Sequence, residues 1–89
     1  MKIIYKYVVE PEGVIVQGHN QKVVLVGIDP KINAICIWVE HELPELSSDH
    51  RVQYLIMGTG FRIEDDESFH AGSCITREGY VWHVYGKRL

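Results

Sequence analysis

The sequence predicts a small all-β domain, an antiparallel sandwich or barrel of about six to seven short strands with little or no helix. Three observations predict it. Short β-prone runs, each bounded by turn residues, follow one another along the whole chain. No long window carries the period of an amphipathic helix. The chain has 89 residues, enough for one domain and too few for two, so we expect residues 1–89 to form a single β domain.

The strand-like runs begin near the N-terminus with "KIIYKYVVE", in which side chains alternate between two faces. This run ends at Pro11-Glu12-Gly13, and the second run ends at Gly18-His19-Asn20, both sequences typical of turns. Seven runs have strand character, namely residues 2–10, 14–17, 22–28, 34–41, 50–58, 69–77 and 80–86.

The third and fourth runs are expected to form a hairpin, because Asp29 and Pro30 between them suit the first two positions of a type I turn. Residues 42–49 then interrupt the pattern. Pro44 and two serines favour a loop there, and eight residues leave room for at most a single helical turn.

The fifth run returns to a period of two and places three side chains on one face, those of Val52, Tyr54 and Ile56. The last two runs flank Glu78-Gly79, a hairpin connection in which glycine accepts a positive φ. Taken together, the runs and turns predict antiparallel pairing throughout.

Charge and composition exclude several classes of protein. The formal net charge is −3 at pH 7, and residues 40–67 carry eight acidic residues against two arginines. Binding to duplex nucleic acid requires a basic stripe, which the sequence lacks. No run of about 18 apolar residues could span a membrane, so we expect a cytosolic protein. Cys36 and Cys74 form no C-x-x-C motif and are expected to be buried, reduced thiols.

Gly58-Thr59-Gly60, followed by Arg62, is the motif that points to a ligand. A phosphate cradle of backbone amides normally leads into a helix, but Phe61 and Ile63 continue an alternating strand pattern, so the Rossmann and Walker motifs are excluded. Two interpretations stay open. The motif is a bend or bulge that ends the fifth run, or its amides and Arg62 contact an anion or a nucleotide.

The five histidines are numerous for this length, but none has metal-ligand spacing, and no metal site is predicted. His19, His41 and His50 are expected to lie in water at turns or strand ends. His83 differs because it lies inside an aromatic strand beside Trp82, with the two side chains on opposite faces.

Catalytic residues are not predicted. The acidic run 64–67 lacks the spaced ligands of a calcium loop, and no serine lies in a nucleophile motif. Cys74 and His70 would lie about 13 Å apart along a strand, too far for a nucleophile and its base. We therefore expect a protein that is not an enzyme and that uses no cofactor.

The runs 22–28 and 34–41 are apolar on both faces. Such strands are typical of the interior of closed layers, or of a face that a second subunit covers. In a chain this small the second explanation predicts a homo-oligomer, most simply a dimer.

Four fragments occur in order along the chain, "IYKY", "CIWV", "GTGF" and "YVWHVY". With these motifs the chain resembles, over nearly its full length, a family of short uncharacterised proteins found mainly in bacteriophage genomes. "GHNQ" at 18–21 departs from the Pro-Gly turn common in that family. The positions that match the family are Tyr5, Lys6, Tyr7, Trp38, Gly58, Thr59, Gly60, Val81, Trp82 and His83.

The resemblance implies an accessory protein in the cytoplasm of the infected bacterial host. We expect a non-catalytic, oligomeric binder that sequesters a small nucleotide-type signal of host defence, a cyclic or linear nucleotide. Aromatic side chains near the glycines would stack on its base. The expected ligand-binding residues are Gly58, Thr59, Gly60, Arg62, Trp82 and His83.

Two alternatives stay open. One is a protein-binding inhibitor of a host enzyme or defence protein, which would use the acidic segments 40–49 and 64–67. The other is a small structural component of the virion. In each case the expected partners include neither duplex nucleic acid nor a membrane.

Overall fold

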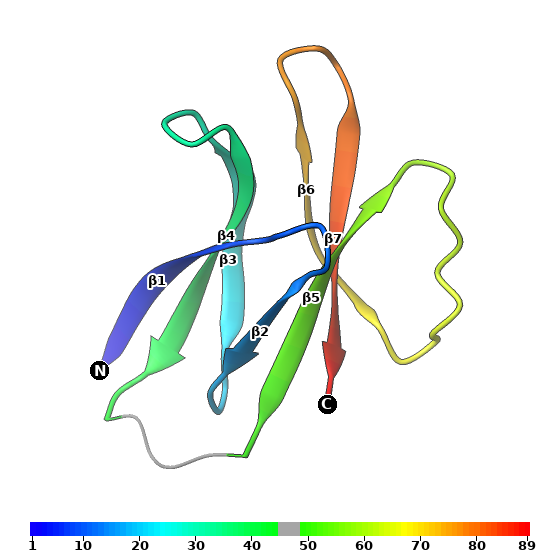
Figure 1. The fold of residues 1–89 in the computed structure, drawn as a ribbon. Helices are drawn as coiled ribbons and strands as arrows, with labels where there is room; N and C mark the ends of the chain where they lie inside the picture. Colours follow the sequence, from blue (N-terminus) through cyan, green and yellow to red (C-terminus); the bar gives the residue numbers. More distant parts are fainter. Residues whose placement is uncertain (45–48) are drawn as a thin grey trace.

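A computed structural model describes residues 1–44 and 49–89, which form two antiparallel sheets (Figure 1). The first sheet has the strand order β1-β4-β3 and the second has β2-β5-β7-β6. The sheets are not closed into a barrel, so the sandwich is confirmed. No helix occurs in those ranges, and hence none that could cross a membrane. The strands are β1 (Lys2–Val8), β2 (Val14–Gln17), β3 (Lys22–Asp29), β4 (Ala34–Glu42), β5 (Arg51–Gly58), β6 (Phe69–Ile75) and β7 (Val81–Arg88).

Both predicted hairpins are confirmed. Between β3 and β4 the amide of Asn33 donates to the carbonyl oxygen of Asp29 at 2.8 Å, and Asn33 adopts a positive φ of 51°. Asparagine tolerates this left-handed conformation better than most residues. Between β6 and β7 the amide of Gly79 donates to the carbonyl oxygen of Thr76 at 2.9 Å, with a φ of 93° at the glycine. Local turn chemistry therefore determines both hairpins.

The core lies between the two sheets and follows the alternation of each strand. Val52 and Tyr54 are buried in it and Ile56 packs against it, so these three side chains share one face as predicted. Cys36 is completely buried, whereas Cys74 is only partly so, and both are free thiols. The largest fully buried side chains are those of Tyr54, Ile37, Val16, Val39, Val84 and Cys36.

The two sheets approach each other closely where β3 meets β6. A Cβ atom added to Gly72 of β6 would lie 2.5 Å from Cγ2 of Val26 in β3. Real Cβ atoms do not approach carbon so closely, so only glycine allows the two strands to pack at this distance. The register of β6 on β7 also shifts here, between His70 and Gly72.

The expectation that residues 61–63 continue a strand is wrong. β5 ends at Gly58, and residues 59–68 form a loop with turns at both ends. The amide of Phe61 donates to the carbonyl oxygen of Gly58 at 3.0 Å, and Gly60 has a φ of 90°. The chain therefore reverses at the glycines. Phe61 and Ile63 alternate in the sequence, but they do not belong to a strand.

The predicted loop at 42–49 begins after β4 ends at Glu42. Its residues 45–48, and with them most of the predicted helical turn, lie outside the described residues. Residues 40–42 belong to β4, so the acidic segment predicted at 40–49 begins inside the first sheet.

Candidate functional site

Gly58 and Trp82 are the two predicted ligand residues that the structure brings together. They are register partners on β5 and β7. A Cβ atom on Gly58 would lie 3.0 Å from Cε1 of Phe61 and 3.2 Å from Cζ3 of Trp82. Glycine at this position thus allows two aromatic rings to pack on the backbone.

Thr59, Gly60 and Arg62 lie apart from that contact, in the exposed loop after β5. A Cβ atom on Gly60 would meet no atom within 4 Å, so this glycine is required by its positive φ and not by packing. The motif is a bend that ends a strand. Whether its amides also contact a ligand stays a prediction.

Trp82 and His83 lie on opposite faces of the second sheet, as alternation predicts. Trp82 shares its face with the buried Val84. His83 points outward, where its Nδ1 lies 2.6 Å from the hydroxyl of Ser73, which also lies 2.8 Å from Nε2 of His70. The structure therefore does not bring the side chains of Trp82 and His83 together on one face of the sheet.

An open cleft of about 910 Å³ lies at one end of the sandwich. Three connections border it: the β1–β2 segment, the tip of the β3–β4 hairpin and the tip of the β6–β7 hairpin. The two hairpin tips stand at the upper end of the molecule in Figure 1. Its apolar walls include Val9, Ile28, Ile35, Ile56, Ile75 and Trp82, and its charged rim is formed by Glu10, Arg77 and Glu78.

Backbone hydrogen bonds hold the cleft walls. The amide of Val9 donates to the carbonyl oxygen of Ile35 at 2.9 Å, which fixes the β1–β2 segment to the first sheet. At the opposite wall, Thr76 and Tyr80 close the hairpin tip with one backbone bond of 2.8 Å and one bond from the Tyr80 amide to Oγ1 of Thr76 at 3.0 Å. Arg77 therefore lies in a turn that these two hydrogen bonds hold in place.

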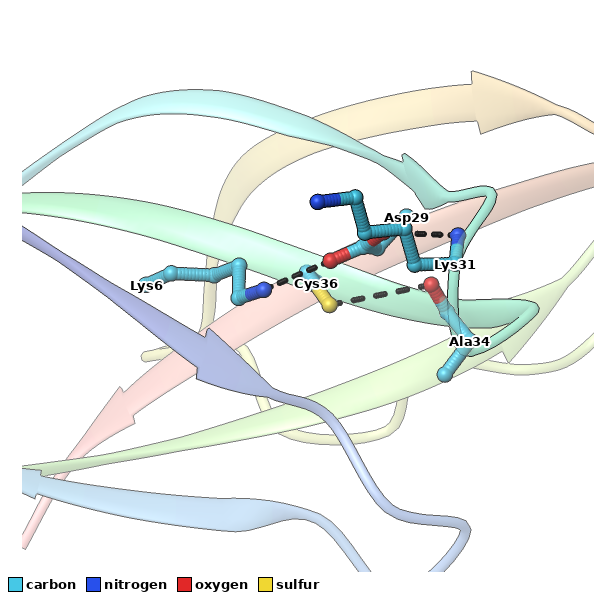
Figure 2. A network of polar contacts seen from close by, with 5 residues as sticks. All are labelled: Lys6, Asp29, Lys31, Ala34 and Cys36. Carbon is cyan, nitrogen blue, oxygen red and sulfur yellow. Dashed lines mark hydrogen bonds and ion pairs between the residues drawn. The ribbon is translucent and has the colours of Figure 1, made fainter.

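An ion pair braces the remaining border of the cleft, the β3–β4 tip (Figure 2). Nζ of Lys6 in β1 donates to Oδ2 of Asp29 at 2.5 Å, and Oδ1 accepts from the amide of Lys31 at 2.9 Å. Cys36 of β4 lies beneath this pair, and its thiol donates weakly to the carbonyl oxygen of Ala34 at 3.7 Å. The pair links the edge strand β1 to the turn that carries Pro30, a cleft residue.

The ion pair and the burial of the thiol shift three pKa values. The Lys6 ammonium, and after it the Lys31 amide, lower the pKa of Asp29. The hydrogen bond to Asp29 raises the pKa of Lys6. Burial raises the pKa of the Cys36 thiol, so this cysteine is not an activated nucleophile.

Acid is expected to destabilise the protein partly through Asp29. A carboxylate whose pKa is lower in the folded state stabilises the fold above its unfolded pKa, and this contribution disappears as the pH falls through the folded value. In urea unfolding at a series of acidic pH values, Asp29→Asn should therefore lose less stability than the wild type. Asp66→Asn, in the exposed loop, is the matched control and should follow the wild type. An equal acid response in Asp29→Asn would contradict the assignment.

The histidines are placed only partly as predicted. His41 is buried and not in water, so that expectation is wrong: Oη of Tyr7 lies 2.9 Å from its Nε2, and Gly18 leaves room for the ring. His19 and His50 are exposed and lie together, with ring centroids 4.9 Å apart. Within the described ranges, no three His, Cys, Asp or Glu side chains are grouped to hold a metal ion.

Arg77 and Glu10 were not among the predicted site residues. They lie in two turns that are far apart in sequence and carry no motif, and only the packing of the sheets brings them to one cleft. Trp82 could be found from sequence because an aromatic residue beside a polar one inside a strand is unusual.

Comparison with known proteins gives a family and no relative of known activity. The domain of unknown function DUF7352 matches residues 1–89. No curated protein and no solved structure matches the chain.

Proposed function

The chain belongs to the DUF7352 family of domains of unknown function, and we propose that it is a non-catalytic binder of a small nucleotide-type molecule. The observation that carries the proposal is the end cleft with Trp82 in its wall. Its volume of about 910 Å³ lies within the range of small-molecule sites, and it combines apolar walls with few charged groups, as such sites do.

In this proposal a nucleobase packs against Trp82, since stacking of a base on an aromatic ring contributes about 1–3 kcal/mol. Arg77 at the rim is the cation available for a phosphate, because a guanidinium can bind two phosphate oxygens at once. Gly58 supports the site from behind by its contact with the Trp82 ring. Glu10 and Glu78 repel a second phosphate, which favours a nucleotide of low charge.

The biological role that we propose is sequestration of a nucleotide-type signal of host defence. The absence of any predicted catalytic motif and the resemblance to short phage proteins support it. A protein that acts by removing a signal requires no catalysis, and it benefits from several binding sites. The proposal therefore includes an oligomer, in the cytoplasm of an infected bacterium.

The test is a thermal melt of the purified protein with cyclic and linear nucleotides. A ligand that binds only the folded state stabilises it by about 2.7 kcal/mol at a hundredfold excess over Kd, which for this size moves the midpoint by several degrees. We expect one nucleotide to give such a shift, and Trp82→Leu and Arg77→Gln to abolish it.

Two controls make the test specific. Trp38→Leu removes the other tryptophan, which lies in the first sheet and outside the cleft, and should keep the shift. Arg62→Gln separates the cleft from the Gly-Thr-Gly loop: loss of the shift in this variant would move the site to that loop. A panel without any shift would contradict nucleotide binding.

A second candidate function is that of a protein-binding inhibitor, favoured by apolar side chains on the outer face of the first sheet. Ile4 and Leu25 are 52% and 54% exposed there, on the face that also carries Trp38. Exposed apolar patches mark interaction surfaces. This function predicts a flat nucleotide panel, together with a host partner whose capture is lost in Leu25→Asp.

A further inference from the structure

A second pocket lies at the end of the sandwich opposite the cleft. In Figure 1 this is the lower end, where the β2–β3 turn, the start of β5 and the end of β7 meet. The pocket has a volume of about 380 Å³. Its lining includes two arginines and two histidines, side chains whose N–H groups can donate to an anion: Arg51, Arg88, His19 and His50.

Backbone bonds fix the three segments that carry these side chains. The amide of Gly18 donates to the carbonyl oxygen of His50 at 2.9 Å, and the amide of Leu89 donates to that of Arg51 at 2.9 Å. Each segment is thus tied to the start of β5, so the four side chains arise from a single rigid frame and not from independent loops.

Ring contacts orient three of these side chains further. The imidazoles of His19 and His50 lie with centroids 4.9 Å apart. The guanidinium carbon of Arg88 lies 4.9 Å from the centroid of the Phe69 ring, a cation–π contact that holds the group beside the pocket.

The charge of this pocket is opposite to that of the whole chain. Among the described residues that line it, none has an Asp or Glu side chain, while both arginines are permanently cationic. The chain as a whole has a net charge of −3, so this local excess is not a consequence of composition.

We propose that this pocket binds a phosphate-type oxyanion, either inorganic phosphate or the phosphate group of a small ester. Arginine forks match the geometry of phosphate oxygens, and imidazole N–H groups supply further donors. The site is separate from the cleft of the proposed function and does not depend on it.

The experiment follows the histidine ring signals by NMR while inorganic phosphate or phenyl phosphate is added at constant ionic strength, with chloride as the replaced anion. Saturable shifts confined to His19 and His50 are expected, while His70 and His83 on the outer sheet face serve as internal references. Arg51→Gln and Arg88→Gln should each weaken binding by about tenfold or more, because each removes a charged donor. Lys31→Gln, an exposed cation in the β3–β4 turn at the other end of the sandwich, should leave the affinity within about twofold of the wild type.

The outcomes separate the two sources of phosphate and the two sites. Tighter binding of phenyl phosphate identifies an ester as the ligand, and equal binding identifies free phosphate. If Arg88→Gln does not fold because its contact with Phe69 is lost, Arg51→Gln carries the test. Shifts of His70 and His83 as large as those of His19 and His50, without saturation, or equal weakening by Lys31→Gln, would overturn the proposal. Retained phosphate binding in Trp82→Leu is expected whether or not the cleft binds a nucleotide.

Discussion

Between pH 10 and pH 12 the protein is expected to lose about 2–3 kcal/mol of stability through Tyr54 alone. The Tyr54 ring is 1% exposed, and burial raises the pKa of its hydroxyl from 10.0 to about 12. Because the unfolded chain releases this proton first, the stabilisation is complete below pH 10 and is lost as the pH rises toward the folded value. Urea unfolding at stepped alkaline pH measures the loss.

Tyr54→Phe isolates this contribution from the titration of other groups. The Tyr54 hydroxyl donates to Oε1 of Gln21 at 2.7 Å, so the phenylalanine variant leaves that oxygen without its donor and should be less stable near neutral pH by about 1–3 kcal/mol. Its disadvantage should then shrink between pH 10 and 12. Tyr80→Phe, at an exposed position, should keep the alkaline loss of the wild type. A constant difference between Tyr54→Phe and the wild type across this range would refute the prediction.

The second large effect is expected from Gly72→Ala. The new Cβ would lie 2.5 Å from Cγ2 and 3.0 Å from Cβ of Val26, and the latter atom is attached directly to the β3 backbone. The strands must therefore separate, at a cost of about 1–3 kcal/mol. Ile28 and Ile75, farther along the same two strands, line the end cleft, so any nucleotide bound there should bind less tightly as well.

Gly27→Ala is the matched control, because it adds a methyl group to the residue that follows Val26 in β3. There the nearest atom to the new Cβ is Cζ3 of Trp38 at 3.8 Å, an ordinary contact. Thermal unfolding should show a clear loss for Gly72→Ala and little change for Gly27→Ala. Equal midpoints for the two variants would show that the β3–β6 contact does not limit the packing of the sheets.

Much of the fold could be predicted because it depends on local patterns. Alternation located the strands and the side chains that share a face of β5, and Asp29-Pro30 and Glu78-Gly79 located both hairpins. The same reasoning failed at residues 61–63, where an alternating pattern has no partner strand. Alternation shows which faces a strand would have, but pairing depends on where the chain turns, and Gly60 turns it away.

The candidate sites were less predictable, for a physical reason. Trp82, which lines the cleft, could be singled out because its strand is unusual by itself. Arg77 and Glu10 of the cleft, and Arg51 and Arg88 of the opposite pocket, are ordinary surface residues in sequence. His41 likewise showed no sign of its burial against Tyr7. Their significance arises from neighbours that are distant along the chain.

The sequence by itself determined the all-β class of residues 1–89 and their two tight hairpins, since turn residues and side-chain alternation act over a few positions. The tertiary structure decided which strands share a sheet, that Trp82 faces inward while His83 faces outward at an exposed cluster, and that the two ends of the sandwich carry different pockets. These features require contacts between strands far apart in sequence, where close packing such as that of Gly72 on Val26 selects one arrangement of the sheets.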